Sequence, residues 1–326
     1  MVDNNFQPMD FGEVFANTFT VIRRTFSRGG WIVLLLLVAA GIFFAWNYMN
    51  YVEGSYKVLS KFAGVDLKTD LKVTQDMQSQ LIGVVIPFIG GLLFFLVLNL
   101  VAQTIATVAS WEGVNNYPVE LGPLLRRSLG KVFFYNIFQS IALGAVIALA
   151  YLVAGIIAFA TGSVGSISPA TVVAFMVAFL VILVVLLLTM FRVQEVDVDD
   201  RGPFRGMISS ITLFRTNKWR AVAPILAFAF AFSALSVLLS VLIMGDTSAM
   251  MGMSSSSSGK DIETQVATLA HARSTMTWKY FLPRAFIDAF GYLFLFNLIT
   301  VVYTDLRIRR GDYVRSEELE AWEQNV

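Results

Sequence analysis

Two side chains of opposite charge stand inside the last apolar stretch of this 326-residue chain. Arg284 and Asp288 are four residues apart, so in a helix they share one face and can contact each other. Ionisable residues at membrane depth are costly and usually face a partner or water, which makes the pair a candidate substrate or proton site. The alternative is a local ion pair at the membrane interface, with Arg284 extending outward. We favour this structural interpretation because Pro283 marks the start of the membrane span, which places the pair near the membrane interface.

Amide side chains in three apolar stretches are the next candidates. Such amides within a membrane most often hydrogen bond from helix to helix. Without a central charge they make a poor polar pathway, so we predict that they serve packing. They are Asn99, Gln103, Asn136, Gln139 and Asn297. If the chain transports a solute, the candidate polar site consists of Arg284, Asp288, Asn99, Gln103 and Asn297.

An acidic cluster follows the fourth apolar stretch and contains Glu195, Asp197, Asp199 and Asp200. Clustered carboxylates can bind Mg²⁺ or Ca²⁺ through their oxygen atoms. A solvated linker beside Arg192, Arg201 and Arg205 explains the cluster more simply. We therefore predict no metal site.

Other kinds of chemistry lack the residues they need. The chain has no cysteine, which removes disulfides and thiolate chemistry, and its single histidine, His271, cannot form a His-based metal site alone. No nucleophile elbow, phosphate-binding loop, dinucleotide fingerprint or zinc signature is present. We expect no enzyme activity and no cofactor. The net charge of +1 gives no reason to expect a nucleic acid partner.

The elements that carry these residues are apolar and long. Hydrophobic residues make up 56% of the chain and charged residues 14%, and the mean hydropathy is +0.68. Soluble domains typically have about 25% charged residues, so this is a membrane protein composition. We predict a single all-α membrane domain over residues 1–326 with six transmembrane helices, since about 20 apolar residues span a bilayer. The spans are Trp31–Met49, Leu81–Ser110, Val132–Thr161, Pro169–Phe191, Trp219–Met244 and Tyr280–Asp305.

Basic residues crowd one side of these spans. An even number of spans puts both termini on one side, and that side receives sixteen arginines and lysines against seven on the other. Cytoplasmic loops carry the excess of basic residues, so we expect both termini in the cytoplasm. The seven are Lys57, Lys61, Lys68, Lys72, Lys260, Arg273 and Lys279.

The cytoplasmic segments repeat a pattern of an amphipathic helix followed by a two-span hairpin. Residues 9–110, 120–191 and 202–305 form three such units, with a flexible outer loop over 245–277 and a short cytoplasmic tail over 306–326. Asp10 and Glu13 suit the N-cap and N3 positions of the first helix. Helices of this kind bury an apolar stripe at the bilayer surface and offer arginines to anionic headgroups; ordinary connecting helices packed on the bundle are equally compatible. The predicted headgroup contacts are Arg23, Arg24, Arg126, Arg127, Arg215, Arg307, Arg309 and Arg310.

Three sequence segments suggest a family. The segments DFGEVFANTFTVIRRTF, GPFRGMISSITLFRTNKWRAVAPILA and VVYTDLRIRRGD together resemble the membrane domain of the bacterial glycerophosphoryl diester phosphodiesterase membrane-domain family and related integral membrane proteins. In the named enzymes of that family the hydrolase is a separate soluble barrel. About 20 residues follow the last span here, far fewer than the roughly 250 of a barrel. The resemblance therefore implies a membrane module without the catalytic domain, and it supplies no catalytic residues.

Three functions remain as hypotheses. The first is a non-catalytic protein of a bacterial inner membrane that organises anionic lipid or a membrane protein partner through its cytoplasmic helices. The second is a small-solute transporter or channel that uses spans two, three and six. The third, an intramembrane enzyme acting on lipid headgroups, has only the acidic cluster in its favour. Three parallel units fit the paired-repeat design of transporters poorly.

Overall fold

A computed structural model describes most of the chain. The described residues are 8–26, 30–61, 71–115, 121–160, 169–199, 201–244 and 262–311. Asp200 and residues 245–261 of the predicted outer loop lie outside them, as does most of the predicted tail, residues 312–326.

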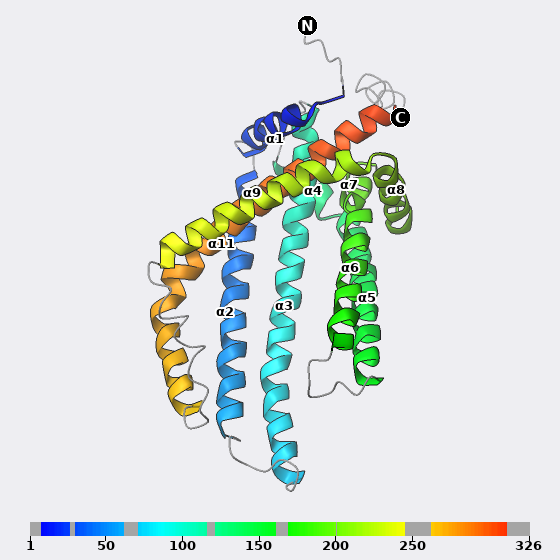
Figure 1. Ribbon diagram of the computed structural model, residues 1–326. Helices are drawn as coiled ribbons and strands as arrows, with labels where there is room; N and C mark the ends of the chain where they lie inside the picture. The colour runs from blue at the N-terminus through cyan, green and yellow to red at the C-terminus, as the bar shows by residue number, and fades with distance from the viewer. Residues whose placement is uncertain are drawn as a thin grey trace. The chain divides into compact units, whose positions relative to one another are not determined.

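The described part of the chain is helical throughout its regular structure (Figure 1). In the first half, α1 covers Phe11–Thr25, α2 Trp31–Lys61, α3 Leu71–Val114, α4 Leu121–Ser128 and α5 Lys131–Ala160. In the second half, α6 covers Pro169–Leu188, α7 Arg192–Asp197, α8 Pro203–Thr216, α9 Lys218–Met244 and α11 Ile262–Arg310.

Six of these helices are long and apolar enough to cross a membrane, as the sequence predicts. All six overlap the predicted spans. The candidate segments are Trp31–Ser55, Gln75–Val114, Gly122–Ile147, Met176–Asp197, Lys218–Leu239 and Pro283–Arg310. The chain therefore has the character of a multi-pass membrane protein.

The last helix is longer at both ends than the sequence suggests. α11 begins at Ile262, so residues 262–277 are helical and do not belong to a flexible loop. Helix-forming glutamate, glutamine, alanine and leucine in this segment give the physical reason. Pro283 lies inside α11 and does not start the helix, but the membrane-spanning segment of α11 begins at Pro283, in agreement with the sequence interpretation. Helix α11 also continues to Arg310, into the predicted tail.

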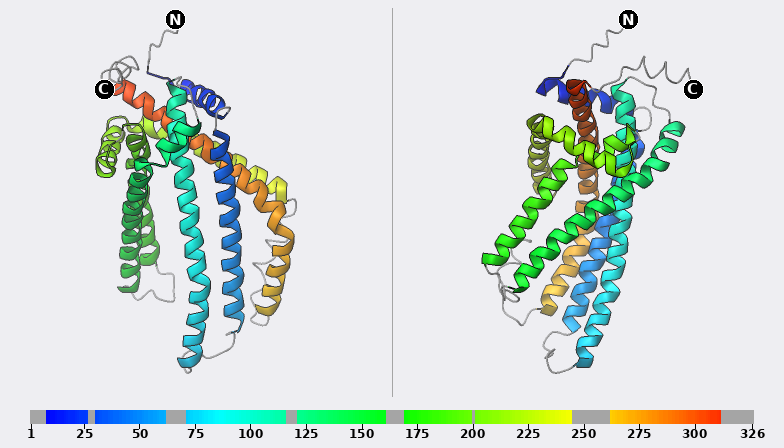
Figure 2. Two further views of the ribbon diagram at one scale, coloured as in Figure 1. Left: turned by 180° about the vertical axis from the view of Figure 1, so that it is seen from behind. Right: turned by 90° about the vertical axis from the view of Figure 1, so that its right-hand side faces the viewer.

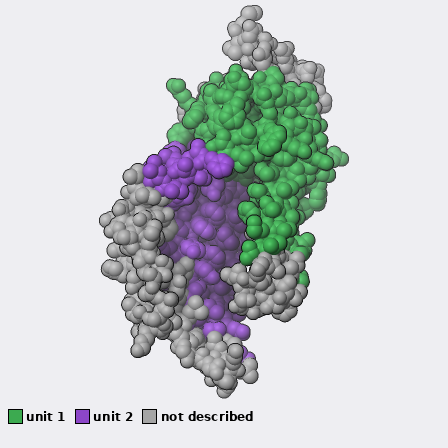
Figure 3. Space-filling model, in the orientation of Figure 1, with its two compact units in different colours: residues 1–33, 103–228, 294–326 green, residues 34–102, 229–293 purple. Residues whose placement is uncertain are grey.

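The chain divides into two compact units (Figure 3). Unit 1 comprises residues 1–33, 103–228 and 294–326, and unit 2 comprises residues 34–102 and 229–293. Each is described separately below. The long helices α2, α3, α9 and α11 contribute residues to both units.

In unit 2, α2 and the first part of α3 run antiparallel through an aromatic seam. Phe44 packs on Phe95 with ring centroids 4.7 Å apart, and Tyr51 stacks on Phe88 at 4.4 Å. Between these pairs, the Asn47 side chain donates a hydrogen bond to the Phe88 carbonyl at 3.0 Å. The partner number in α3 falls as the number in α2 rises, which is the antiparallel order.

Unit 1 is built around the end of α11. Every residue from Thr300 to Leu306 is buried, a pattern expected for a helix covered on all sides. Its Leu298, Val302 and Leu306 join a core with Val14 and Val21 of α1 and with residues of α8 and α9. In the same unit α5 and α6 lie side by side, as both views of Figure 2 show.

The outer faces of α5 and α6 are apolar. Phe134, Ile141 and Leu149 of α5 are exposed, as are Val173 and Phe179 of α6. A water-soluble protein rarely exposes so continuous an apolar surface, whereas a lipid-facing helix pair must do so. This surface agrees with the spans assigned by length and composition.

Candidate functional site

The helix of the fourth span is interrupted between α6 and α7, and a serine side chain hydrogen bonds to the backbone groups at the interruption. α6 ends at Leu188 and α7 begins at Arg192. The buried Ser210 side chain on α8 accepts a hydrogen bond from the Phe191 N–H and donates one to the Leu188 carbonyl, both at 3.1 Å. Buried backbone groups need partners, so this hydroxyl replaces bonds that a continuous helix would make.

Gly206 lets α8 approach α7 closely. A Cβ atom at this position would lie 3.0 Å from Cγ2 of Val196 and 3.1 Å from Nε2 of Gln139, closer than ordinary packing allows. Ser210 follows Gly206 by four residues, so both face the same way on the helix. A glycine therefore brings Ser210 to the interruption.

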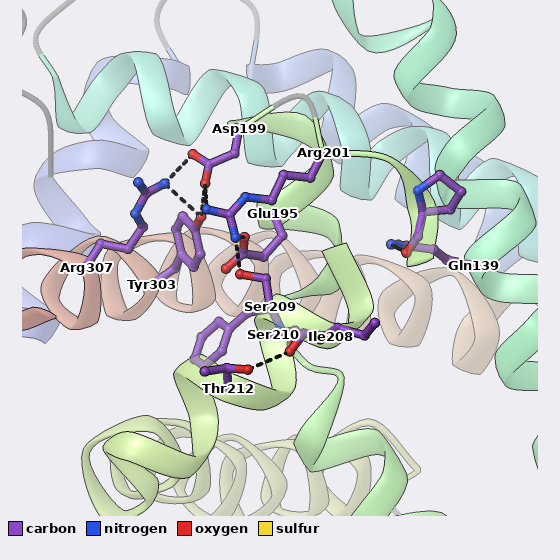
Figure 4. Close-up of polar contacts among 12 residues, drawn as sticks. Gln139, Glu195, Asp199, Arg201, Ile208, Ser209, Ser210, Thr212, Tyr303 and Arg307 are labelled. Atoms are coloured by element: carbon purple, nitrogen blue, oxygen red, sulfur yellow. Dashed lines mark hydrogen bonds and ion pairs between the residues drawn. The ribbon is translucent and has the colours of Figure 1, made fainter. Parts of the chain in front are cut away.

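A network of two carboxylates and two guanidinium groups lies next to this interruption (Figure 4). Arg201 forms ion pairs with Glu195 at 2.8 Å and with Asp199 at 3.2 Å. Asp199 also pairs with Arg307 and accepts a hydrogen bond from the Tyr303 hydroxyl at 3.4 Å. Arg307 donates to the same hydroxyl at 3.2 Å. We call Glu195, Asp199, Arg201, Tyr303 and Arg307 the carboxylate–arginine network.

This network corrects our interpretation of the acidic cluster. Glu195 and Asp197 are buried, so they do not belong to a solvated linker. A buried charge is costly unless a partner compensates it, and two arginines compensate Glu195 and Asp199. Within the described residues, no group of three or more His, Cys, Asp and Glu side chains could hold a metal ion.

Asn136 and Gln139 of α5 bond to other segments, as predicted for packing amides. The Asn136 side chain donates to Oδ1 of Asp197 at 2.7 Å and to Thr104 of α3 at 3.2 Å. Gln139 donates to the Pro203 carbonyl at 2.8 Å. Asn297 of α11 behaves likewise and accepts from Ser110 of α3 at 2.6 Å. The packing prediction is confirmed for these three amides.

A pocket in unit 2 contains three of the five candidate transport residues. Its volume is about 260 Å³, and Arg284, Asp288 and Asn99 line it together with Tyr292 and mostly apolar side chains of α2. Arg284 pairs with Asp288 at 2.9 Å and donates to the Ser236 hydroxyl at 2.6 Å. Both charged side chains remain about one-third exposed, at 35% and 37%. The pocket thus combines an apolar wall with an accessible positive and negative charge.

The remaining two candidate transport residues are not among the residues that line the pocket. Gln103 and Asn297 belong to unit 1, where Asn297 is buried against Ser110. Asn99 lines the pocket, although its side chain donates to the Phe95 carbonyl of its own helix at 3.0 Å. The structure therefore places three of the five candidates in the lining of the pocket, and Gln103 and Asn297 are not among its lining residues.

The arginines predicted to contact headgroups fall into two classes. Arg307 belongs to the carboxylate–arginine network, and Arg309 pairs with Asp305 at 2.9 Å and donates to the Met9 carbonyl at 2.6 Å. Both arginines therefore have partners inside the protein. The other six have exposed side chains, and for them the prediction stands: Arg23, Arg24, Arg126, Arg127, Arg215 and Arg310.

Ser210 and the pairing of Asp199 with Arg307 are the features that sequence reasoning missed. More than 100 residues separate Asp199 from Arg307, so only the fold can bring them together. One pattern in the sequence does point to Ser210. In α1 the buried hydroxyl of Thr18 follows the buried Val14 by four residues, just as Ser210 follows the buried Gly206 by four residues in α8. The neighbouring Ser209 hydroxyl contacts Arg201 instead.

Comparison with known proteins gives one finding. The family model described as Domain of unknown function (DUF7847) matches residues 15–279, from within α1 to within α11. Arg284, Asp288, Tyr303 and Arg307 lie beyond that match. No curated protein and no solved structure matches the chain.

Proposed function

We propose that this chain, which belongs to the family described as Domain of unknown function (DUF7847), organises anionic lipid or a membrane protein partner and has no catalytic role. The spans would form three hairpins in a bacterial inner membrane, each preceded by a surface helix, α1, α4 or α8. Both termini would be cytoplasmic. The resemblance to the membrane domain of the glycerophosphoryl diester phosphodiesterase membrane-domain family would then reflect the same kind of module.

The buried face and the exposed aromatic face of α1 carry this proposal. Val14, Thr18, Val21 and Thr25 are buried in unit 1, so the helix is already anchored to the protein by one stripe. Phe11, Phe19 and Phe26 are nevertheless exposed, by 50%, 63% and 38%. At 100° per residue, these phenylalanines form a second stripe beside the buried one. A helix that buries one stripe in protein and exposes an aromatic stripe suits the surface of a bilayer.

Helix α8 has the same division. Gly206, Ser210 and Leu213 face the protein, while Phe204 and Ile208 are exposed by 63% and 65%. Arg215 lies on the exposed apolar side of the helix in its last turn. α4 ends in the same way, with a buried Leu124 and Ser128 and with Arg126 and Arg127 exposed. Exposed apolar side chains next to arginines are the arrangement that attracts anionic headgroups.

The test replaces exposed arginines for which the structure gives no side-chain hydrogen bond within the described part of the protein. Arg24 and Arg127 donate to the carbonyls of Gly113 and Asp197, so the test variant replaces Arg23, Arg126 and Arg215 with glutamine. The purified protein should then carry less anionic phospholipid than the wild type, measured by mass spectrometry of lipids retained in detergent.

A matched control replaces Lys57, Lys61 and Lys72, which we place on the opposite side of the membrane, with glutamine. It loses the same charge and should retain its anionic lipid. Equal lipid content in all three proteins, together with unchanged co-purification of any protein partner, would contradict the proposal.

The pocket in unit 2 favours a second candidate, transport of a small zwitterionic or amphipathic solute. Its apolar wall and the Arg284–Asp288 pair match a ligand that carries both charges and an apolar part. In proteoliposomes, Asp288→Asn should abolish flux of such a solute without changing the amount of folded protein. The exposed Asp76 of α3 provides the control, since Asp76→Asn should leave flux intact. Flux that survives Asp288→Asn would exclude this pathway.

The carboxylate–arginine network does not favour a lipid-cleaving enzyme. Two guanidinium groups neutralise Glu195 and Asp199, so neither carboxylate is placed to act as a general base.

A further inference from the structure

Asp197, at the end of α7, is a buried carboxylate whose oxygen atoms form no ion pair with any described residue, although the charge of Arg127 acts on it. Its side chain is 2% exposed, and Oδ1 accepts a hydrogen bond from the Asn136 amide at 2.7 Å. Oδ2 has no partner. Arg127 donates to the backbone carbonyl of Asp197 and not to the carboxylate, at 3.2 Å. An ionised carboxylate at this depth needs a positive charge to compensate it.

Further buried oxygen atoms without a partner lie on α3, α4 and α5. Oδ1 of Asn136 has no partner either. It is bonded to the same carbon as the Nδ2 that donates to Asp197, just as Oδ2 of Asp197 is bonded to the same carbon as the Oδ1 that accepts. The hydroxyl of Thr107 also lacks a partner, one helical turn after Thr104, which accepts from Asn136. The hydroxyl of Ser128, the residue after Arg127 in the sequence, has no partner either. All three side chains are at most 1% exposed.

Oδ2 of Asp197 and Oδ1 of Asn136 are acceptors, and a hydroxyl such as that of Thr107 can act as one, so a bound cation would supply the partner that these atoms lack. Buried polar atoms without partners are rare in native proteins, and each one calls for a missing partner such as an ion or a water molecule. The carboxylate–arginine network shows the alternative arrangement, in which arginines compensate the acids. At Asp197, by contrast, Arg127 binds the backbone carbonyl, and the carboxylate itself is left with one amide donor, from Asn136.

The charge of the site limits the kind of ion. One carboxylate, one amide oxygen and hydroxyl groups form a site with a single negative charge. Mg²⁺ and Ca²⁺ sites typically hold more carboxylates, as well as coordinating water for Mg²⁺. A hard monovalent cation matches both the single charge and the oxygen ligands. Interrupted membrane helices, like the break between α6 and α7, are also where Na⁺ commonly binds.

We propose that Asp197 and Asn136, with the hydroxyl of Thr107, form a buried binding site for a monovalent cation, and that Na⁺ occupies it. The site belongs to unit 1 and does not depend on the lipid-organising role or on the pocket in unit 2. It would tie α3, α5 and α7 together through the bound ion.

Binding of ²²Na⁺ to the purified protein in detergent tests the proposal. The wild type should bind saturably, with one ion per chain, and the ion should not be displaced by choline. Asp197→Asn removes the charge while keeping the shape of the side chain, and it should lose saturable binding. Asp76→Asn, at an exposed position of α3 outside both proposed sites, should bind as the wild type does.

Asn136→Ala provides a second variant should Asp197→Asn fail to fold, with folding checked by circular dichroism and gel filtration. It should weaken Na⁺ binding by at least about tenfold, a loss typical even of outer-shell partners of metal ligands. The proposal is overturned if the wild type shows no saturable binding, which would leave a protonated Asp197 or trapped water. Unchanged binding by a folded Asp197→Asn or Asn136→Ala variant would overturn it as well.

Discussion

At the scale of single residues, polar side chains in unit 1 replace bonds that the backbone cannot make. Ser210 accepts from Phe191 and donates to Leu188 where α6 gives way to α7. In a membrane no water is available to take over, so an unpaired amide or carbonyl there would cost the full desolvation energy. A single buried hydroxyl therefore holds the interruption in place.

Replacing Ser210 with alanine should measurably destabilise the protein. The Phe191 N–H and the Leu188 carbonyl would both lose their partner, at a cost of about 1–3 kcal/mol for a buried group left unsatisfied. Thermal unfolding in detergent should show a lower Tm for Ser210→Ala. The control is Thr212→Ala on the same helix, whose exposed hydroxyl bonds only to its own helix, and its Tm should stay near that of the wild type. Equal Tm values for both variants would show that the serine is dispensable.

At the scale of elements, α1 shows what amphipathic periodicity can and cannot predict. The capping residues were predicted correctly: Asp10 accepts from the Glu13 N–H at 2.7 Å, and Glu13 accepts from the Asp10 N–H at 2.7 Å. The apolar stripe was predicted as one surface, but the structure divides it. Val14 faces the protein while Phe11, Phe19 and Phe26 remain exposed. Periodicity identifies the apolar residues of a helix, but which of them meet protein depends on neighbours distant in sequence.

The exposed stripe of α1 should contact lipid. Because the chain has no cysteine, one introduced cysteine can carry a fluorescent NBD label without a background signal. In nanodiscs, a label at Phe26→Cys should emit at shorter wavelength and be quenched by lipids with spin-labelled acyl chains. A label at Asn17→Cys, on the polar face of the same helix, should resist this quenching. Equal quenching at the two positions would contradict the surface orientation of α1.

At the scale of the whole molecule, the sequence predicted the class and number of elements better than the site. Apolar length alone predicted six spans, because the bilayer imposes nearly the same requirement on every spanning helix. The carboxylate–arginine network could not be predicted, since its pairs join residues far apart in the chain. The acidic cluster looked like a linker because short-range composition cannot show that α11 covers it.

The central claim is that the chain crosses the membrane six times with both ends on the cytoplasmic side. Six helices fit that number, and the uneven distribution of basic residues predicts the orientation. Since the protein has no cysteine, single cysteines at Asn4, Ser166, Ser256 and Asn325 can report which side each position faces.

The most direct test is labelling of these four variants in intact cells with a maleimide that cannot cross the inner membrane. We predict labelling of Ser166→Cys and Ser256→Cys in intact cells, and of Asn4→Cys and Asn325→Cys only after the inner membrane is permeabilised. Labelling of one terminus but not the other in intact cells would mean an odd number of spans and would contradict the account.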